Sequence, residues 1–142
     1  MRELDRCLQL AKTIKEKQEL IIELKAKTMH PKSQILSDMP KGGSIENEIE
    51  TYLIKLERLE NYVKGLKEKR GKCWNRIVRK LTACNITDPE TIKLLFMRFY
   101  AGKAWEKCNN EMREHYPHSK WNLNKCFRVY RAVLVKIDKK DD

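Results

Sequence analysis

The sequence lacks the short motifs that mark most enzyme active sites. It has no glycine-rich phosphate loop, no nucleophile elbow and no carboxylate pair at a spacing suited to acid–base chemistry. Of its three histidines, His115 and His118 stand beside a proline in a predicted turn, and no third ligand follows at a useful spacing. We therefore expect a protein that is not an enzyme and that needs no metal or other cofactor.

Paired cysteines and long apolar runs are also missing. The five cysteines are odd in number, widely spaced and form no Cys-x-x-Cys pair, so neither a zinc site nor a disulfide framework is indicated. We expect them to be small buried residues of a protein in a reducing compartment. No apolar run approaches the roughly 20 residues of a membrane-spanning helix, and the N-terminus has no apolar signal core. The expected location is the cytoplasm, away from membranes.

Aromatic residues are scarce, at 8%, whereas charged residues make up 36% of the chain. This balance favours long, surface-rich helices over one deep core. The net charge of +11 is also unevenly placed, because residues 1–63 are neutral while residues 64–80 and 98–140 each carry +7. The second half of the chain is therefore expected to face a polyanion.

Helical periodicity predicts two long helices in the first part of the chain. Residues from Arg2 to Met29 contain no glycine or proline and place apolar side chains at helical spacing. His30-Pro31 ends this helix, and residues 30–43 read as a connector. Ser44 is suited to cap a second helix, which can continue as far as Leu81 despite Gly65 and Gly71.

The second helix opens with three heptads of a coiled-coil seam. Two arrangements satisfy this seam: pairing with the first helix of the same chain, or a parallel homodimer through Ile45 to Leu66. The basic residues from Lys64 to Lys80 are spread around this helix, so both phosphate contact and simple solvation are open for them. The apolar residues of the seam are Ile45, Ile49, Tyr52, Leu56, Leu59, Val63 and Leu66.

Three shorter helices are predicted after a break at residues 85–87. Asp88-Pro89-Glu90 is a strong helix start, and Gly102 is suited to end that helix. A second helix follows from about Ala104 to Glu114 and breaks at the proline turn. Ser119 or Asn122 can cap the last helix, whose inward positions are Leu123, Cys126, Phe127, Tyr130, Val133, Leu134 and Ile137.

One segment of this region resembles a known family. Leu94 to Trp105, LLFMRFYAGKAW, is similar to the core of the sigma-region-4-like helix-turn-helix of small phage-encoded transcriptional regulators of Gram-positive bacteria, the ArpU/RinA-like group. The matching residues include Arg98, Tyr100, Gly102 and Trp105, and residues 38–43, DMPKGG, resemble the junction before the long helix of such proteins. Two features depart from the family: Ala104 stands where a capping Ser or Thr is usual, and the turn before the last helix is expanded around residues 116–121.

The resemblance and the helix pattern together imply an all-α fold, with a long helical hairpin or coiled coil followed by a three-helix helix-turn-helix domain. We expect the boundary between residues 1–84 and residues 85–142. The resemblance implies a DNA-binding regulator that acts on promoter DNA and whose N-terminal helices dimerise or contact host RNA polymerase. In such a domain the last helix meets double-stranded DNA, so the expected contact residues are Lys120, Asn122, Asn124, Lys125, Arg128 and Arg131.

A second interpretation stays open, motivated by the expanded turn. The chain is then a helical phage protein that binds and inhibits or redirects a host enzyme or nucleoprotein complex, and its basic face serves that protein contact.

Overall fold

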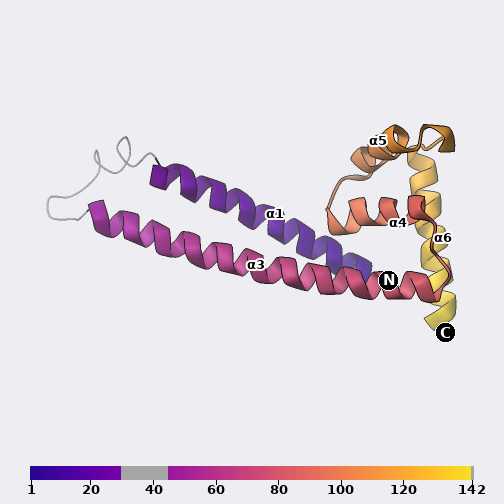
Figure 1. Ribbon diagram of the computed structural model, residues 1–142, viewed down its shortest axis with the longest axis horizontal. Coiled ribbons are helices and arrows are strands. Elements are labelled where there is room, and N and C mark those ends of the chain that lie inside the picture. Colours follow the sequence, from indigo (N-terminus) through magenta and orange to yellow (C-terminus); the bar gives the residue numbers. More distant parts are fainter. Residues whose placement is uncertain (30–44, 142) are drawn as a thin grey trace. The chain divides into compact units, whose positions relative to one another are not determined.

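The computed structural model describes residues 1–29 and 45–141, and over these residues the chain is helical with no strand (Figure 1). The all-α prediction is therefore confirmed for this part of the chain. The predicted connector, the junction-like segment 38–43 and the Ser44 cap lie outside the described residues. The helices are α1 (Arg2–Met29), α3 (Ile45–Ala83), α4 (Pro89–Leu95), the π-helical turn η1 (Phe96–Tyr100), α5 (Trp105–His115), the 3-10 turn η2 (Pro117–Ser119) and α6 (Leu123–Asp141).

The two long helices were predicted closely. α1 covers the predicted span, and α3 runs unbroken through Gly65 and Gly71. An added Cβ would meet nothing within 4 Å at either glycine, so packing does not require glycine there. Each glycine lowers the stability of the helix relative to alanine. Among the described helices, none combines the length and the apolarity needed to cross a lipid bilayer.

By its contacts the chain divides into two compact units. Unit 1 comprises Met1–Lys12 and Lys69–Asp142, and unit 2 comprises Thr13–Glu68. The start of α1 and the end of α3 thus belong to the same unit as the C-terminal helices. The boundary between residues 84 and 85 stays a prediction.

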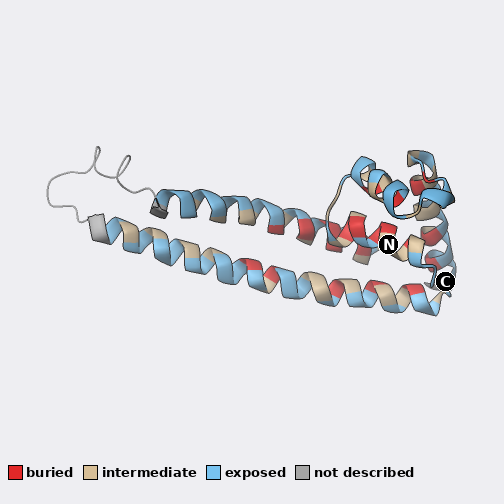
Figure 2. Ribbon diagram, turned by 45° about the horizontal axis from the view of Figure 1, so that its top comes forward, coloured by how far each residue is buried: buried red, intermediate tan, exposed pale blue. Residues whose placement is uncertain are grey.

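Unit 2 consists of the second part of α1 and the first part of α3, which run antiparallel side by side (Figures 1 and 2). Lys25 pairs with Glu60 at 3.6 Å, and the Lys27 ammonium lies 6.0 Å from the centre of the Tyr52 ring. Most of this unit is exposed, as the pale blue of Figure 2 shows. Of the seam residues from Ile49 onward, Val63 and Leu66 are buried, whereas Ile49, Tyr52, Leu56 and Leu59 are half-buried.

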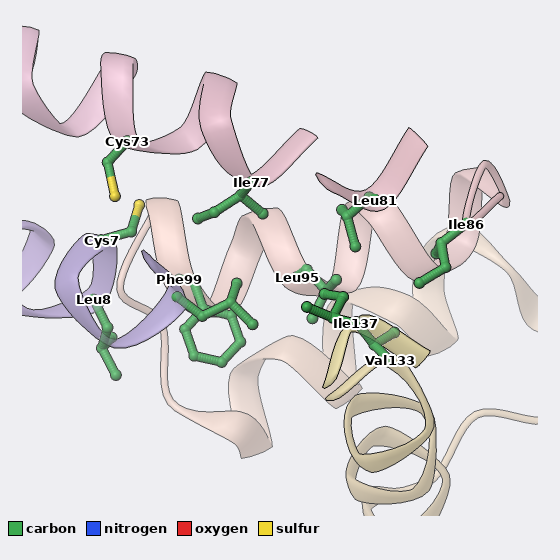
Figure 3. Close-up of a cluster of buried hydrophobic side chains, with 11 residues drawn as sticks. Cys7, Leu8, Cys73, Ile77, Leu81, Ile86, Leu95, Phe99, Val133 and Ile137 are labelled. Atoms are coloured by element: carbon green, nitrogen blue, oxygen red, sulfur yellow. The ribbon is translucent and has the colours of Figure 1, made fainter. Parts of the chain in front are cut away.

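The main core of unit 1 joins four α-helices and the π-helical turn η1 (Figure 3). The start of α1 packs against the end of α3, and α4, η1 and the second half of α6 close the cluster. In Figure 3 the sulfur atoms of Cys7 and Cys73 point toward each other inside this core. The buried members are Leu4, Cys7, Leu8, Cys73, Ile77, Leu81, Ile86, Leu95, Phe99, Val133 and Ile137.

A second, smaller core lies among the three C-terminal helices. It holds Leu94, Met97, Cys108, Met112, Trp121 and Cys126. Trp105 packs against both cores, so it ties the C-terminal helices to the rest of unit 1. Of the predicted inward positions of the last helix, Cys126, Val133 and Ile137 are buried, and Leu123, Phe127, Tyr130 and Leu134 are half-buried.

Candidate nucleic-acid interface

The start of α4 confirms the capping signal read from the sequence. Asp88 has extended backbone angles, and its carboxylate accepts hydrogen bonds from the Thr91 amide at 3.3 Å and the Thr91 hydroxyl at 2.9 Å. Pro89 occupies the first turn, where its missing amide hydrogen is not needed. These local contacts fix where the first of the three C-terminal helices begins.

The corner between η1 and α5 depends on Gly102. This glycine has φ +74°, a left-handed conformation that favours glycine. A Cβ at this position would lie 3.1 Å from the Cβ of Ala11, so α1 also approaches closely here. The Lys103 amide then donates to the Met97 carbonyl at 3.0 Å and closes the corner.

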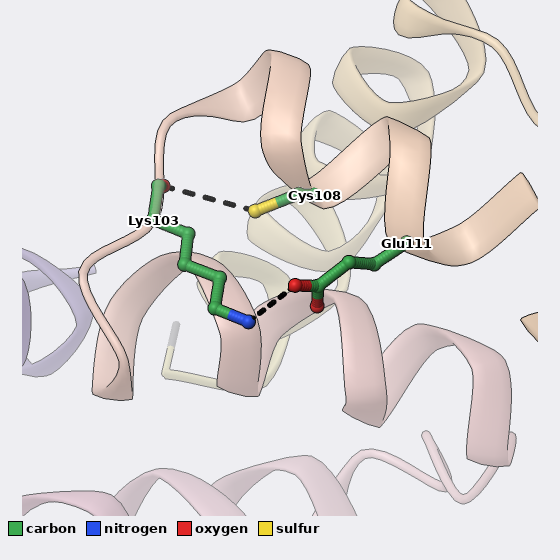
Figure 4. A network of polar contacts seen from close by, with 3 residues as sticks. All are labelled: Lys103, Cys108 and Glu111. Carbon is green, nitrogen blue, oxygen red and sulfur yellow. Dashed lines mark hydrogen bonds and ion pairs between the residues drawn. The ribbon is translucent and has the colours of Figure 1, made fainter. Parts of the chain in front are cut away.

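Polar contacts fix the same corner from the side of α5 (Figure 4). The Arg98 guanidinium donates to the Lys103 carbonyl at 3.0 Å and lies 5.2 Å from the centre of the Trp105 ring. The Lys103 ammonium binds Glu111, and this hydrogen bond lowers the pKa of the Glu111 carboxyl. The Cys108 thiol reaches the same Lys103 carbonyl at 3.7 Å.

Ala104 caps α5 without any side-chain hydrogen bond, which agrees with the departure noted in the sequence. The loss of a capping side chain typically costs about 1 kcal/mol. The contacts of Arg98 and Lys103 give the corner other restraints. Arg98 therefore acts here as a structural residue, although the sequence singled it out only as part of a family pattern.

The segment between α5 and α6 is held in place by Trp121. The indole Nε1 of this buried residue donates to Glu90 at 2.9 Å. Hydrogen bonds from the Ser119 side chain and from Trp121 lower the pKa of the Glu90 carboxyl. Because Glu90 belongs to α4, the turn is tied to the first of the three helices.

Lys125 completes the restraint of this turn. Its ammonium donates to the Ser119 carbonyl and lies 4.3 Å from the centre of the Trp121 ring. Helical spacing predicts an outward-facing Lys125, but its side chain is half-buried and engaged within the protein. Its position depends on the tertiary placement of Trp121, which helical spacing alone does not reveal.

The remaining predicted contact residues are exposed. Lys120 has φ 52° and ends the 3-10 turn, and Asn122 caps α6 by accepting the Lys125 amide at 2.7 Å. Asn124, Arg128 and Arg131 follow at spacings of four and three residues, so they share one face of α6. We call these three residues the α6 stripe.

A second basic surface was not isolated in the sequence. The residues from Lys64 to Lys80 were interpreted as spread around their helix, but Lys80 pairs with Glu3 at 2.9 Å and Arg70 donates to the Tyr100 carbonyl at 3.2 Å. The exposed basic residues left in this part of unit 1 are Lys69, Lys72, Arg76 and Arg79, which share one face of α3 and which we call the α3 stripe. The spacing of three, four and three residues was a usable signal.

Four thiols of unit 1 are buried, and burial makes them poor nucleophiles. Burial raises the pKa of the Cys7 thiol to about 12 and that of Cys108 to about 11. Burial likewise raises the pKa values of Cys73 and Cys126. Over residues 1–29 and 45–141, no three His, Cys, Asp or Glu side chains gather into a group able to hold a metal ion.

Comparison of the chain with protein-family models, curated proteins and solved structures finds no match.

Proposed function

We propose that the three C-terminal helices form a sigma-region-4-like helix-turn-helix that binds double-stranded DNA, with α6 as its recognition helix. The α6 stripe carries this proposal. Arg128 and Arg131 are exposed and make no ion pair with another described residue, and an amide side chain precedes them on the same face. Arginine and asparagine are the side chains that read guanine and adenine edges in the major groove.

The restrained turn supports the same assignment. A recognition helix must present its N-terminal residues at a fixed angle to the groove. Here the Trp121–Glu90 hydrogen bond ties the segment before α6 to α4, and the Lys125–Ser119 hydrogen bond ties α6 to η2. Residues 94–105 also resemble the helix-turn-helix core of the ArpU/RinA-like regulators. We therefore propose that the protein is a phage-type transcriptional regulator that acts on promoter DNA in the cytoplasm.

The test is fluorescence anisotropy with labelled duplex DNA at low salt. We expect the wild-type chain to bind and Arg128→Gln/Arg131→Gln to bind much more weakly. The matched control is Lys55→Gln/Arg58→Gln, which removes the same charge from exposed positions of α3 in unit 2. Absence of wild-type binding, or equal affinity of the α6 variant and the control, would refute the proposal.

Sequence preference is tested separately, by selection of duplexes from a random pool. Asn124→Ala is expected to relax the preference at one base pair, because a bidentate contact discriminates by about 1–3 kcal/mol. If the selected pool is the same for wild type and this variant, Asn124 does not read bases.

Unit 2 favours a second candidate function, the binding of a protein. Among the described residues, seven large apolar side chains are exposed, and five of them lie in this unit: Leu20, Ile22, Leu53, Ile54 and Tyr62. Ile22 is 67% exposed and Tyr62 is 51% exposed. Apolar side chains of this kind support contact with host RNA polymerase or another host protein, or homodimer formation through Ile45 to Leu66.

Two measurements separate these outcomes. Sedimentation of a monomer well above micromolar concentration would rule out the homodimer. Retention of purified bacterial RNA polymerase that survives nuclease treatment, and that is lost in Ile22→Ser/Leu53→Ser, would favour the protein-binding candidate. If nuclease treatment abolishes the retention, the two proteins were held together only because both bound the same DNA.

A further inference from the structure

The α3 stripe presents four positive charges on one side of its helix. Successive residues of an α-helix are turned by about 100°, which places four side chains on the same side of α3: Lys69, Lys72, Arg76 and Arg79. Lys72 and Arg76 lie nearly opposite Trp74, whose ring packs edge-on against Phe96 at a centroid distance of 5.3 Å. The stripe therefore lies on the side of α3 opposite the side that packs against η1.

The side chains of the four stripe residues make no ion pair or hydrogen bond with another described residue. Their neighbours in the sequence differ in this respect, since Lys80 binds Glu3 and Arg70 binds Tyr100. Four like charges on one helix face repel one another. A polyanion would offset this repulsion, and no ion pair with another described residue does so.

Two exposed arginines, Arg2 and Arg6, lie at the start of α1 in the same unit. Burial raises the pKa of the Cys73 thiol, and the charges of Arg6 and Arg76 oppose that rise. Both guanidiniums therefore lie close enough to act on the same buried thiol, one from each helix. Arg2 is exposed one turn before Arg6 on α1.

The kind of polyanion follows from composition and spacing. No large exposed apolar side chain lies on α3 from residue 69 to its end, so this face lacks the apolar anchors of protein interfaces and of membrane-surface helices. From Lys69 to Arg79 the helix rises about 15 Å. One strand of duplex DNA presents a phosphate every 3.4 Å or so along its axis, which gives about four phosphates over that length.

We propose that the α3 stripe is a second DNA-contact surface, which binds phosphates of the duplex without reading sequence. This inference rests on the proposed DNA-binding function. It assigns contact with DNA phosphates to a surface outside the three C-terminal helices. Phosphate contact requires charge and no particular base, so it contributes affinity and salt dependence but no sequence preference.

The experiment measures affinity for a random-sequence duplex of about 30 base pairs as a function of salt, using the full chain. Lys72→Gln/Arg76→Gln removes two predicted phosphate contacts. Its slope of log affinity against log salt should be shallower than that of wild type by about 1.8, from roughly 0.9 for each contact. Between about 50 and 200 mM salt, wild type should then lose roughly tenfold more affinity than the variant.

Two controls accompany this variant. Lys55→Gln/Arg58→Gln carries the same charge change in unit 2 and should keep the wild-type slope. Lys72→Arg/Arg76→Lys keeps both charges and should also keep it, because phosphate contact depends on charge. Circular dichroism of each variant confirms that the helices are retained.

The outcomes are distinct. A wild-type slope for Lys72→Gln/Arg76→Gln, together with lost affinity for Arg128→Gln/Arg131→Gln, overturns the α3 stripe alone. Equal slope changes in the stripe variant and the unit 2 control also overturn it, because the total charge of the protein would then explain the change in salt dependence. Absence of wild-type binding at low salt overturns both proposals. If polyglutamate of matched charge competes for the stripe as well as unlabelled duplex does, the surface is a general acidic-polymer site and the DNA assignment is wrong.

Discussion

Replacing Gly102 with alanine tests how the corner before α5 is built. Its φ of +74° places the residue in the left-handed region, where a Cβ costs roughly 1–2 kcal/mol. The added Cβ would also lie 3.1 Å from the Cβ of Ala11, so α1 or the corner must shift by a few tenths of an ångström. Both effects lower the free energy of unfolding.

Gly71→Ala is the matched control, because it makes the same chemical change in the same unit. Gly71 lies inside α3, and an added Cβ there meets nothing within 4 Å. Alanine is favoured in a helix interior, so this variant should be more stable than wild type by about 0.5–1 kcal/mol. The loss of unfolded-state freedom is common to both variants and cancels in their difference. We expect Gly102→Ala to be less stable than Gly71→Ala by about 2 kcal/mol or more.

Urea unfolding followed by circular dichroism measures this difference directly. The single variant Ala11→Gly and the double variant Ala11→Gly/Gly102→Ala separate the two causes. Measured against Ala11→Gly, the cost of Gly102→Ala should fall by the part due to the close Cβ contact and keep the part due to backbone strain. The reasoning is refuted if Gly102→Ala is as stable as Gly71→Ala.

Three further predictions concern unit 1. Trp121→Phe removes the indole donor to Glu90 and should lower the free energy of unfolding by about 1–2 kcal/mol, since the acceptor is charged but partly exposed; an unchanged urea midpoint would contradict this. Because the hydrogen bonds that lower the Glu90 pKa are present only in the folded state, their stabilisation is complete above the ordinary value of 4.5 and declines as pH falls through the lowered pKa. Unfolding measured from pH 7 to about pH 2 should show this decline, and Glu90→Gln should weaken it; equal acid sensitivity would count against the contact. In a thiol-reagent titration of the native protein, the half-buried Cys84 should react first, while Cys7, Cys108 and the other buried thiols react only on unfolding; five equally fast thiols would contradict the described burial.

Features set by local sequence were predictable. The Asp88-Pro89 start, the Gly102 corner and the Asn122 cap each depend on a few consecutive residues, and each is present in the structure. Helical periodicity likewise located α1 and α3, because a long apolar pattern averages over single exceptions such as Gly65.

Features set by distant residues were not predictable. Lys125 was expected to point outward, but Trp121 and Ser119 recruit its ammonium into the turn. The spacing of the α3 stripe was a usable signal, but only the fold shows that Lys80 pairs with Glu3, 77 positions away in the chain, and Arg70 with Tyr100. Helical spacing indicates which side chains share a face, whereas the fold decides which of them remain exposed.

The central claim is that the α6 stripe meets DNA, and NMR of the isotope-labelled protein tests it residue by residue. On titration with duplex DNA at low salt, we predict that the largest shift changes fall on the backbone amides and side chains of Asn124, Arg128 and Arg131. Amides of unit 2, such as those of Lys55 and Arg58, should change little. Changes confined to unit 2, or no change in α6 at saturating DNA, would contradict the account.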